Sequence, residues 1–380
     1  MKILLIPSWY TTDEKPLAGI FFKEYAESLV KYGHEVAVLY IDIRRGVSKD
    51  LRGITAKSVN GVKEFRYSNV NYTPGIAAGV NWQKRVHLRK MFNVLEEQFG
   101  VPDVIHLESC DAVYLAQKAR ERWEIPFVYT EHLSNLVSGN GSAYYEKMFQ
   151  KAVFSADACI AISSVFWNKM NKLRNSEIYR IPNGIAVERL VQSIPGKIFT
   201  VKALGALRAI KGYDVLIHAF NEFAKGKCDV KLVIGGEGAE RSHLEKIICT
   251  LHCQECIVLE GSIERKEVPH FYEDCSVFVC SSQIETFSIV TAEALCSGVP
   301  VVATKCGGPE DMINESNGLL VNVGDAEHMA KALETIYNRI DLYDRKKISA
   351  EAMGGFNYKS IVNQHERLYE KVKNGYRKNR

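Results

Sequence analysis

The sequence predicts an α/β protein in which two domains each contain a parallel β-sheet. Short apolar runs, such as residues 277–280 and 299–304, have the length and composition of buried strands. Segments of helical character separate these runs, and parallel strands need crossover connections of that kind. The chain has 380 residues, which is enough for two domains of typical size.

Strands and helices alternate in the first half of the chain. A strand is predicted at residues 3–6, followed by a loop that contains Gly19, a helix at 20–32 and a strand at 36–41. Further strands are predicted at residues 101–106, 125–132 and 156–164, and a helix that ends near residue 172 follows the last of them. Asn183 and Gly184 together suit a tight turn.

The second half begins after residues 193–197, the best linker candidate because Pro and Gly are adjacent there. Strands are predicted at residues 198–204, 231–234, 257–261, 277–280 and 299–304, and helices at 213–225, 287–297, 326–338 and 358–373. The predicted domains are residues 1–190 and 197–355, and residues 356–380 form a terminal helical segment.

Two carboxylates lie between the predicted strands at 277–280 and 299–304. Glu285 lies where the loop meets a helix, and Glu293 follows eight residues later, so both can face one cleft. The amides of a helix N-terminus bind phosphate. Those amides belong to Thr286, Phe287, Ser288 and Ile289. A diphosphate there leaves one carboxylate near each end of an elongated ligand, as a nucleotide sugar requires. From spacing alone, a solvated helix-start charge and a surface residue explain the two carboxylates equally well.

Other polar residues follow predicted strands. Arg208 and Lys211 come after the strand at 198–204, where two cations suit a diphosphate, although solvated loop charges are the alternative. Gly236 follows the strand at 231–234 and permits close approach of the backbone to a ligand. His132 ends the strand at 125–132, on the sheet edge where open α/β sheets bind ligands.

The segment around Glu285 resembles the donor site of retaining glycosyltransferases of the GT-B fold, glycosyltransferase family 4 (glycosyl transferases group 1). The resemblance lies in Glu285-Thr286-Phe287-Ser288, Glu293, Ala-Leu-x-x-Gly-Val-Pro-Val-Val-Ala-Thr and Gly-Gly-Pro-Glu. The usual family text is Glu-Gly-Phe-Gly, so this chain lacks two glycines. The resemblance extends over about residues 1–370 and implies two Rossmann-like domains that face a central cleft. It also implies that the terminal helix of residues 356–380 returns to the first domain.

The resemblance also implies roles for individual residues. Glu285 and His132 contact the donor sugar, Glu293 contacts the nucleotide ribose, and Lys211 stabilises the leaving diphosphate. The family arginine is missing at Ala206, and we expect Arg208 to reach the phosphates instead. The remaining residues expected at the donor site are Gly19, Gly236, Ile263, Thr286, Phe287, Ser288 and Ile289.

The expected activity is transfer of a sugar, with retention, from a nucleotide-diphosphate sugar to an acceptor hydroxyl. UDP is preferred over GDP as the nucleotide, and the acceptor is a saccharide, expected to be lipid-linked in bacterial surface polysaccharide synthesis. The resemblance implies no cofactor and no required metal, and the absence of an Asp-x-Asp motif agrees with this. A nucleotide-sugar 2-epimerase and a non-catalytic sugar-nucleotide binder on the same fold are the alternatives.

Charge and cysteine content bear on the cellular setting. The net charge is +4, and basic residues are densest between residues 44 and 90. A basic helix at 82–92 suits either a peripheral contact with an anionic membrane or a solvated surface, and nothing indicates nucleic-acid binding. The scattered cysteines favour a cytoplasmic protein, expected at the inner face of the membrane. Cys249, His252, Cys253 and Cys256 raise the question of a metal site, without a second ligand pair.

Overall fold

The computed structural model describes residues 1–12, 14–73, 77–139, 141–174, 177–194 and 196–378. The chain divides into two compact units. The first domain comprises Met1–Ile162, Phe166–Ile181 and Ile361–Arg380, and the second comprises Ser163–Val165 and Pro182–Ser360. The domain boundaries given in the sequence analysis stay a prediction. Pro195 of the predicted linker lies outside the described residues.

The first domain is built on an eight-stranded sheet of order β3-β4-β2-β1-β5-β6-β7-β8. All neighbouring strands pair in parallel except β3 and β4, which are antiparallel. The strands are β1 (Lys2–Pro7), β2 (Glu35–Arg44), β3 (Gly53–Val59), β4 (Val62–Val70), β5 (Val104–Glu108), β6 (Phe127–Thr130), β7 (Ala158–Ala161) and β8 (Ile178–Arg180). The helices are α1 (Ile20–Lys31), α2 (Ala77–Val86), α3 (Leu88–Gln98), α4 (Val113–Trp123), α5 (Ala143–Ser155), α6 (Ser164–Asn171) and α13 (Tyr358–Lys378).

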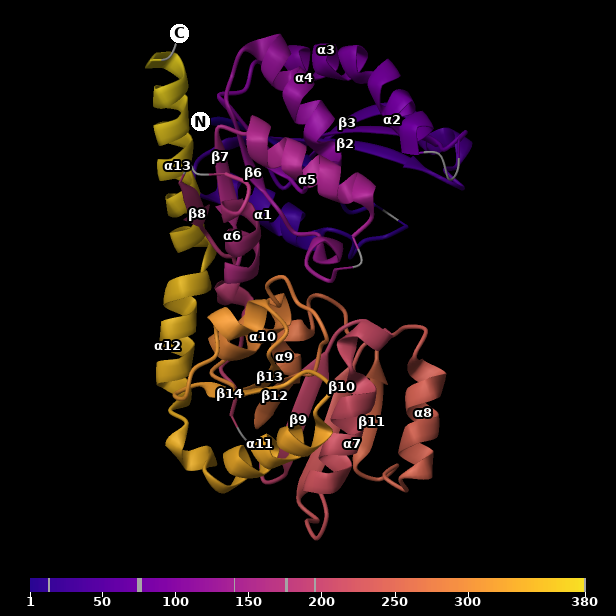
Figure 1. The fold of residues 1–380 in the computed structure, drawn as a ribbon, viewed down its shortest axis with the longest axis vertical. Coiled ribbons are helices and arrows are strands. Elements are labelled where there is room, and N and C mark those ends of the chain that lie inside the picture. Colours follow the sequence, from indigo (N-terminus) through magenta and orange to yellow (C-terminus); the bar gives the residue numbers. More distant parts are fainter. Residues whose placement is uncertain (13, 74–76, 140, 175–176, 195, 379–380) are drawn as a thin grey trace. The chain divides into compact units, whose positions relative to one another are not determined.

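The second domain has a six-stranded parallel sheet of order β11-β10-β9-β12-β13-β14 (Figure 1). The strands are β9 (Phe199–Leu204), β10 (Val230–Gly235), β11 (Ile257–Gly261), β12 (Val277–Cys280), β13 (Val301–Thr304) and β14 (Gly318–Val321). The helices are α7 (Tyr213–Phe223), α8 (Arg241–Thr250), α9 (Val268–Phe271), α10 (Ile289–Cys296), α11 (Ala326–Asn338) and α12 (Arg345–Phe356).

Each sheet has one point at which strand order reverses. In the first domain this point lies between β1 and β5, and in the second it lies between β9 and β12. Open α/β sheets bind ligands outside the carboxyl ends of the strands at such a switch point. The topology therefore directs attention to the loops that follow these four strands.

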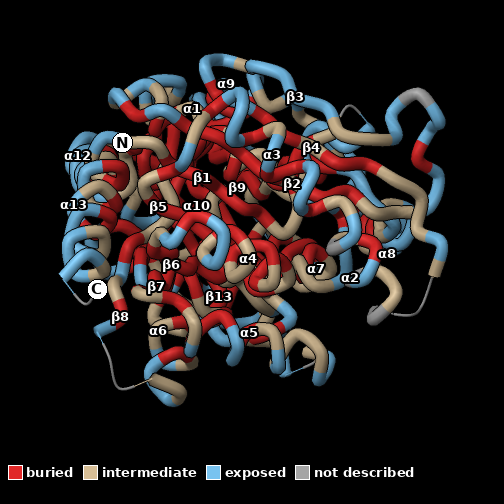
Figure 2. The backbone as a smooth tube through the Cα atoms, turned by 90° about the horizontal axis from the view of Figure 1, so that it is seen from above, coloured by how far each residue is buried: buried red, intermediate tan, exposed pale blue. Residues whose placement is uncertain are grey.

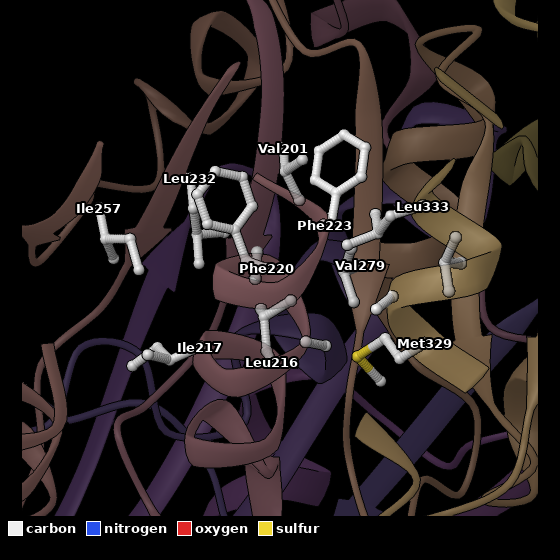
Figure 3. Close-up of a cluster of buried hydrophobic side chains, with 14 of the residues drawn as sticks. Val201, Leu216, Ile217, Phe220, Phe223, Leu232, Ile257, Val279, Met329 and Leu333 are labelled. Carbon is white, nitrogen blue, oxygen red and sulfur yellow. The ribbon is translucent and has the colours of Figure 1, made fainter. Parts of the chain in front are cut away.

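Buried apolar residues of the strands and their covering helices form the cores. Figure 2 shows the central strands as buried along most of their length. In the second domain, Phe220 and Leu216 of α7 pack with strand residues such as Val201 and Leu232, and Leu333 of α11 joins the same cluster (Figure 3). This close packing fixes β9 and β10 in place and so fixes the points from which the following loops extend.

The structure corrects two predicted helices. The basic helix expected at 82–92 is two helices, α2 and α3, separated at His87. The helix expected from residue 287 begins at Ile289, because Ser288 adopts a left-handed conformation with φ of 79°. Along the described part of the chain, every helix is too short or too polar to span a bilayer.

Candidate functional site

Lys211 and Glu285 are in contact at the switch point of the second domain. Lys211 follows β9 and Glu285 follows β12. The Nζ atom of Lys211 lies 2.6 Å from Oε1 of Glu285. The hydroxyl of Ser282 donates to the same carboxylate oxygen over 2.8 Å. The predicted lysine and the first predicted acid thus form one cluster.

The loops that carry this pair are tied to each other. The Ser281 hydroxyl donates to the Lys211 carbonyl over 2.8 Å, and the Gln283 amide donates to the Ile210 carbonyl over 2.8 Å. Gly212 has φ of 62°, and a Cβ there would lie 2.3 Å from the Ser281 carbonyl oxygen. Only glycine permits this close approach, so Gly212 lets the two loops meet and fixes the Lys211 backbone.

The electrostatics of the pair keep Lys211 charged. Burial opposes the charge, but the nearby Glu285 carboxylate outweighs burial, so the pKa of Lys211 lies above its ordinary value. Burial, reinforced by Cys280 and Glu285, raises the pKa of the neighbouring Tyr213. The pocket around Glu285 therefore contains a stable ammonium group and a neutral phenol.

The start of α10 supplies backbone donors beside Glu285. Ser288 is the N-cap, and its hydroxyl lies 2.8 Å from Thr291 Oγ1. Within the described residues, the backbone N–H groups of Phe287 and Ile289 have no acceptor. Of the predicted amides, Thr286 and Phe287 precede the helix and Ser288 and Ile289 begin it. The set of donors at the helix start is therefore shifted by two residues from the prediction.

Glu293 is buried on α10 and paired with Arg265. The Arg265 Nη1 atom lies 2.6 Å from Glu293 Oε1, and the Tyr272 hydroxyl lies 3.3 Å from Oε2. Tyr272 also donates to the Val290 carbonyl over 3.1 Å. Arg265 follows β11 and is a residue that sequence analysis missed, since an isolated loop arginine carries no signal. These contacts fix the Glu293 carboxylate in one orientation.

The remaining predicted residues of the second domain lie near the same sheet edge. Arg208 is exposed, and within the described part of the chain its guanidinium has no ion-pair partner. Gly236 follows β10, and a Cβ there would lie 1.9 Å from the Gly205 carbonyl oxygen, so this glycine is required by packing between β9 and β10. Ile263 follows β11 and packs near Gly235.

In the first domain, His132 follows β6 and is paired with Glu108. Its Nε2 atom lies 2.8 Å from Glu108 Oε2, and both side chains are buried. Glu108 ends β5 at the switch point, and sequence analysis missed it. Gly19 is the N-cap of α1 and has φ of 70°. A Cβ there would lie 3.0 Å from the Trp9 carbonyl oxygen, so the backbone conformation and the close contact explain why a glycine occupies this position.

Among the described residues, no group of three or more His, Cys, Asp or Glu side chains is arranged to hold a metal ion. Cys249, His252, Cys253 and Cys256 are among the residues to which this applies. Cys249 is exposed, whereas the Cys253 thiol donates to Asn221 Oδ1 over 2.8 Å. This cluster is therefore the end of α8 and the turn that follows it.

Two family models together account for most of the chain. The model described as glycosyl transferases group 1 matches residues 187–353, and the one described as glycosyltransferase family 4 matches residues 18–189. The chain is 28% identical over 322 residues to a GDP-mannose-dependent α-mannosyltransferase of Mycobacterium tuberculosis, covering 80% of this chain and 79% of the relative. It is 25% identical over 398 residues to the putative teichuronic acid biosynthesis glycosyltransferase TuaC of Bacillus subtilis, covering 96% and 98%.

Solved structures show the same fold. A sucrose-phosphate synthase of Thermosynechococcus elongatus superposes with a TM-score of 0.79 at 18% identity, covering 98% of this chain and 99% of that one. Anabaena Alr3699/HepE in complex with UDP and glucose superposes with a TM-score of 0.74 at 19% identity, covering 98% and 100%. The predicted family and fold class are confirmed. The chain therefore belongs to glycosyltransferase family 4 and has the GT-B fold.

Proposed function

We propose that this glycosyltransferase moves a sugar, with retention, from a nucleotide-diphosphate sugar to an acceptor hydroxyl. The observation that carries the proposal is the contact between Lys211 and Glu285 at the switch point of the second sheet, beside the start of α10. A cation and backbone donors next to a carboxylate suit a ligand that joins a diphosphate to a hydroxyl-bearing ring.

Each group has a proposed role in the reaction. Lys211, with Arg208 and the amides at the start of α10, stabilises the negative charge that grows on the leaving diphosphate. Glu285 and His132 orient the sugar, and Glu293 binds the ribose. A phosphate oxygen of the leaving group accepts the acceptor hydroxyl proton. The reaction then needs neither a metal nor a protein base, so sugar transfer should persist in excess EDTA.

UDP is the proposed nucleotide, and GDP is the competing one. UDP accompanies HepE in its solved complex, whereas the mycobacterial relative is named for GDP-mannose. A thermal-shift screen of UDP-, GDP- and ADP-sugars separates these donors, because a ligand that binds the native state raises the melting temperature by mass action. Glu293→Ala is the control and should abolish the shift. No shift with any nucleotide sugar would refute the donor site.

Product analysis separates the proposal from its alternatives. Transfer to an acceptor, with the anomeric configuration of the donor kept, identifies a retaining glycosyltransferase by NMR of the product. An epimerase consumes the donor without any acceptor and yields an isomeric sugar nucleotide. A non-catalytic binder shows a thermal shift but no turnover. Lys211 and Glu285 argue against the last alternative, because pure binding does not need a charge aimed at a leaving group.

A saccharide acceptor is part of the proposal, in the form of a lipid-linked saccharide used in bacterial surface polysaccharide synthesis. The named role of TuaC in teichuronic acid biosynthesis supports this setting. A panel of lipid-linked acceptors with matched water-soluble saccharides tests it. Transfer that is equally efficient to both classes would contradict a requirement for the lipid.

A peripheral contact with the inner face of the membrane completes the proposal. On α2, Trp82 is 64% exposed and Val86 is 51% exposed, and the exposed Arg89 and Lys90 follow on α3. Apolar and basic side chains together suit an anionic lipid surface. Lys84 does not contribute, because it is paired with Asp111 over 2.8 Å. Trp82→Ser should reduce sedimentation with anionic vesicles, and equal sedimentation with neutral vesicles would refute the contact.

A further inference from the structure

Two buried carboxylates hold His132 in the first domain. One oxygen of Glu131 accepts the backbone N–H groups of His132 and Leu133, over 2.7 Å and 2.9 Å. Glu108 accepts from the ring Nε2 atom over 2.8 Å. The rings of Phe21 and Phe22 pack against the imidazole, with centroids 5.2 Å and 5.0 Å away. The backbone and the ring of His132 are thus fixed by separate groups.

Glu108 lies at the one place in the first sheet where a ligand is expected. Its strand, β5, pairs with β1 on one side and β6 on the other, and the switch point lies between β1 and β5. Glu108 is opposite Pro7 on β1 and opposite Thr130 on β6. The carboxylate therefore ends its strand at the same sheet edge as His132, two residues beyond Thr130.

His132 is the main partner of Glu108: burial raises the pKa of Glu108, and the hydrogen bond with His132 opposes that rise. The Glu108 side chain is 5% exposed. Its other oxygen lies 3.4 Å from Nε2 of His106, but that atom is already 2.7 Å from Thr130 Oγ1, and Nδ1 of His106 is 2.6 Å from the Tyr369 hydroxyl. Burial lowers the pKa of His106 well below its ordinary value, so this ring is neutral. Among the described residues, His132 is the closest donor to the Glu108 carboxylate.

We infer that Glu108 is a positioning residue that fixes the tautomer and orientation of His132 for contact with a hydroxyl group of the donor sugar. A carboxylate only accepts hydrogen bonds, so Nε2 of His132 carries the proton. In the neutral ring, Nδ1 is then an acceptor, and a sugar hydroxyl is a donor that matches it. The inference rests on the proposed function, because it assigns Glu108 a role through His132.

A purely structural role explains Glu108 less well. A buried carboxylate destabilises a fold unless it is paired, and the apolar residues of β5, Val104, Ile105 and Leu107, pack without that penalty. Holding a reacting or binding group in one geometry is a recognised use of such a pair, because small displacements lower turnover strongly. Glu64 on β4 offers a matched comparison: it is also buried, and it accepts from the Tyr10 hydroxyl over 3.1 Å.

Glu108→Gln tests the inference, with Glu64→Gln as the control. The glutamine amide can donate to Nε2, which favours the other tautomer of His132. We expect kcat for sugar transfer to fall on the order of 100-fold in Glu108→Gln while KM for the donor changes little. Glu64→Gln should keep the wild-type kcat. In a His132→Ala background, Glu108→Gln should lower kcat no further. An equal fall in both backgrounds would overturn the inference.

Nitrogen NMR of 15N-labelled histidine gives a second measurement that needs no turnover. The His132 signals, assigned by their loss in His132→Ala, should show a protonated Nε2 in the wild type and in Glu64→Gln. They should change in Glu108→Gln. If wild-type protein transfers no sugar, the proposed function fails, and the ring signals alone decide whether Glu108 fixes His132. Unchanged His132 signals in Glu108→Gln would overturn the inference.

Discussion

Lys211→Met tests whether the lysine stabilises charge on a leaving diphosphate. The substitution removes the ammonium group that lies 2.6 Å from Glu285 Oε1. The two side chains are 26% and 14% exposed, so water screens part of the pair. We expect a loss of about 1–2 kcal/mol, below the roughly 3–5 kcal/mol for breaking a fully buried pair. In a domain of this size, that loss lowers Tm by about 2–8 °C.

The effect on catalysis should exceed the effect on stability. Removing one preorganised group that stabilises developing negative charge lowers kcat by about 100- to 1,000-fold, or roughly 3–4 kcal/mol. The pKa of Lys211 is raised above its ordinary 10.5, so its charge contributes in full below that pH and is lost only as pH rises through the raised value. The ratio of mutant to wild-type kcat should therefore stay constant between about pH 6 and pH 9.

Lys202→Met is the matched control for this measurement. Lys202 lies on β9, is buried, and donates to the Phe271 carbonyl over 2.8 Å as well as to Asp274. Its loss should lower Tm by a similar or larger amount and leave kcat/KM for the donor close to the wild-type value. The reasoning about Lys211 fails if Lys211→Met keeps wild-type kcat/KM, or if the two variants lose activity equally.

Three further predictions concern pH, ribose binding and packing. Burial lowers the pKa of His365 to about 4, so between about pH 6.5 and pH 4 the unfolded chain binds a proton at this residue and the native state does not. The free energy of unfolding should therefore fall by about 3 kcal/mol as pH drops from 6.5 to 4. Thermal melts across this range check the slope, and His365→Gln should flatten it. Arg265→Met leaves the buried Glu293 without its cation and should weaken UDP binding at least tenfold by calorimetry, with little change in kcat; unchanged affinity would remove Glu293 from the ribose site. Gly236→Ala should cost more than about 2 kcal/mol in denaturant unfolding, since a Cβ would lie 1.9 Å from a carbonyl oxygen, whereas Gly226→Ala, with no atom within 4 Å, should cost about 1 kcal/mol.

Sequence patterns predicted the second domain well because its signals are local. The run Val277–Cys280 is entirely apolar and is β12 in the structure, with the predicted limits. Lys211 was predicted in the loop after the strand at 198–204, and Glu285 where the loop after the strand at 277–280 meets a helix. Parallel topology brings the loops at the carboxyl ends of neighbouring strands together. The predicted start of α10 was wrong by two residues, because Ser288 adopts a left-handed conformation that a serine in the sequence does not predict.

The first domain was harder to predict because its features depend on distant contacts. The antiparallel strands β3 and β4 went unpredicted, although Asn60 and Gly61 between them have φ of 49° and 82° and such a pair is a strong hairpin signal. The break between α2 and α3 at His87 has no proline or glycine to mark it. Glu108 and His132 are far apart in sequence, so predicting their contact would have required knowledge of the register between β5 and β6.

The two domains share one physical arrangement at their switch points. In the first sheet, Glu108 ends a strand beside the reversal and lies 2.8 Å from a ring nitrogen of His132. In the second sheet, Glu285 follows a strand beside the reversal and lies 2.6 Å from the ammonium nitrogen of Lys211. A carboxylate alone at a sheet edge is free to rotate or to take up a proton when it is buried. Pairing fixes its rotamer, and in the second domain it also keeps the ammonium group charged. The polar groups at both switch points are therefore oriented before any ligand binds, which is the condition under which electrostatic stabilisation of a transition state is most effective.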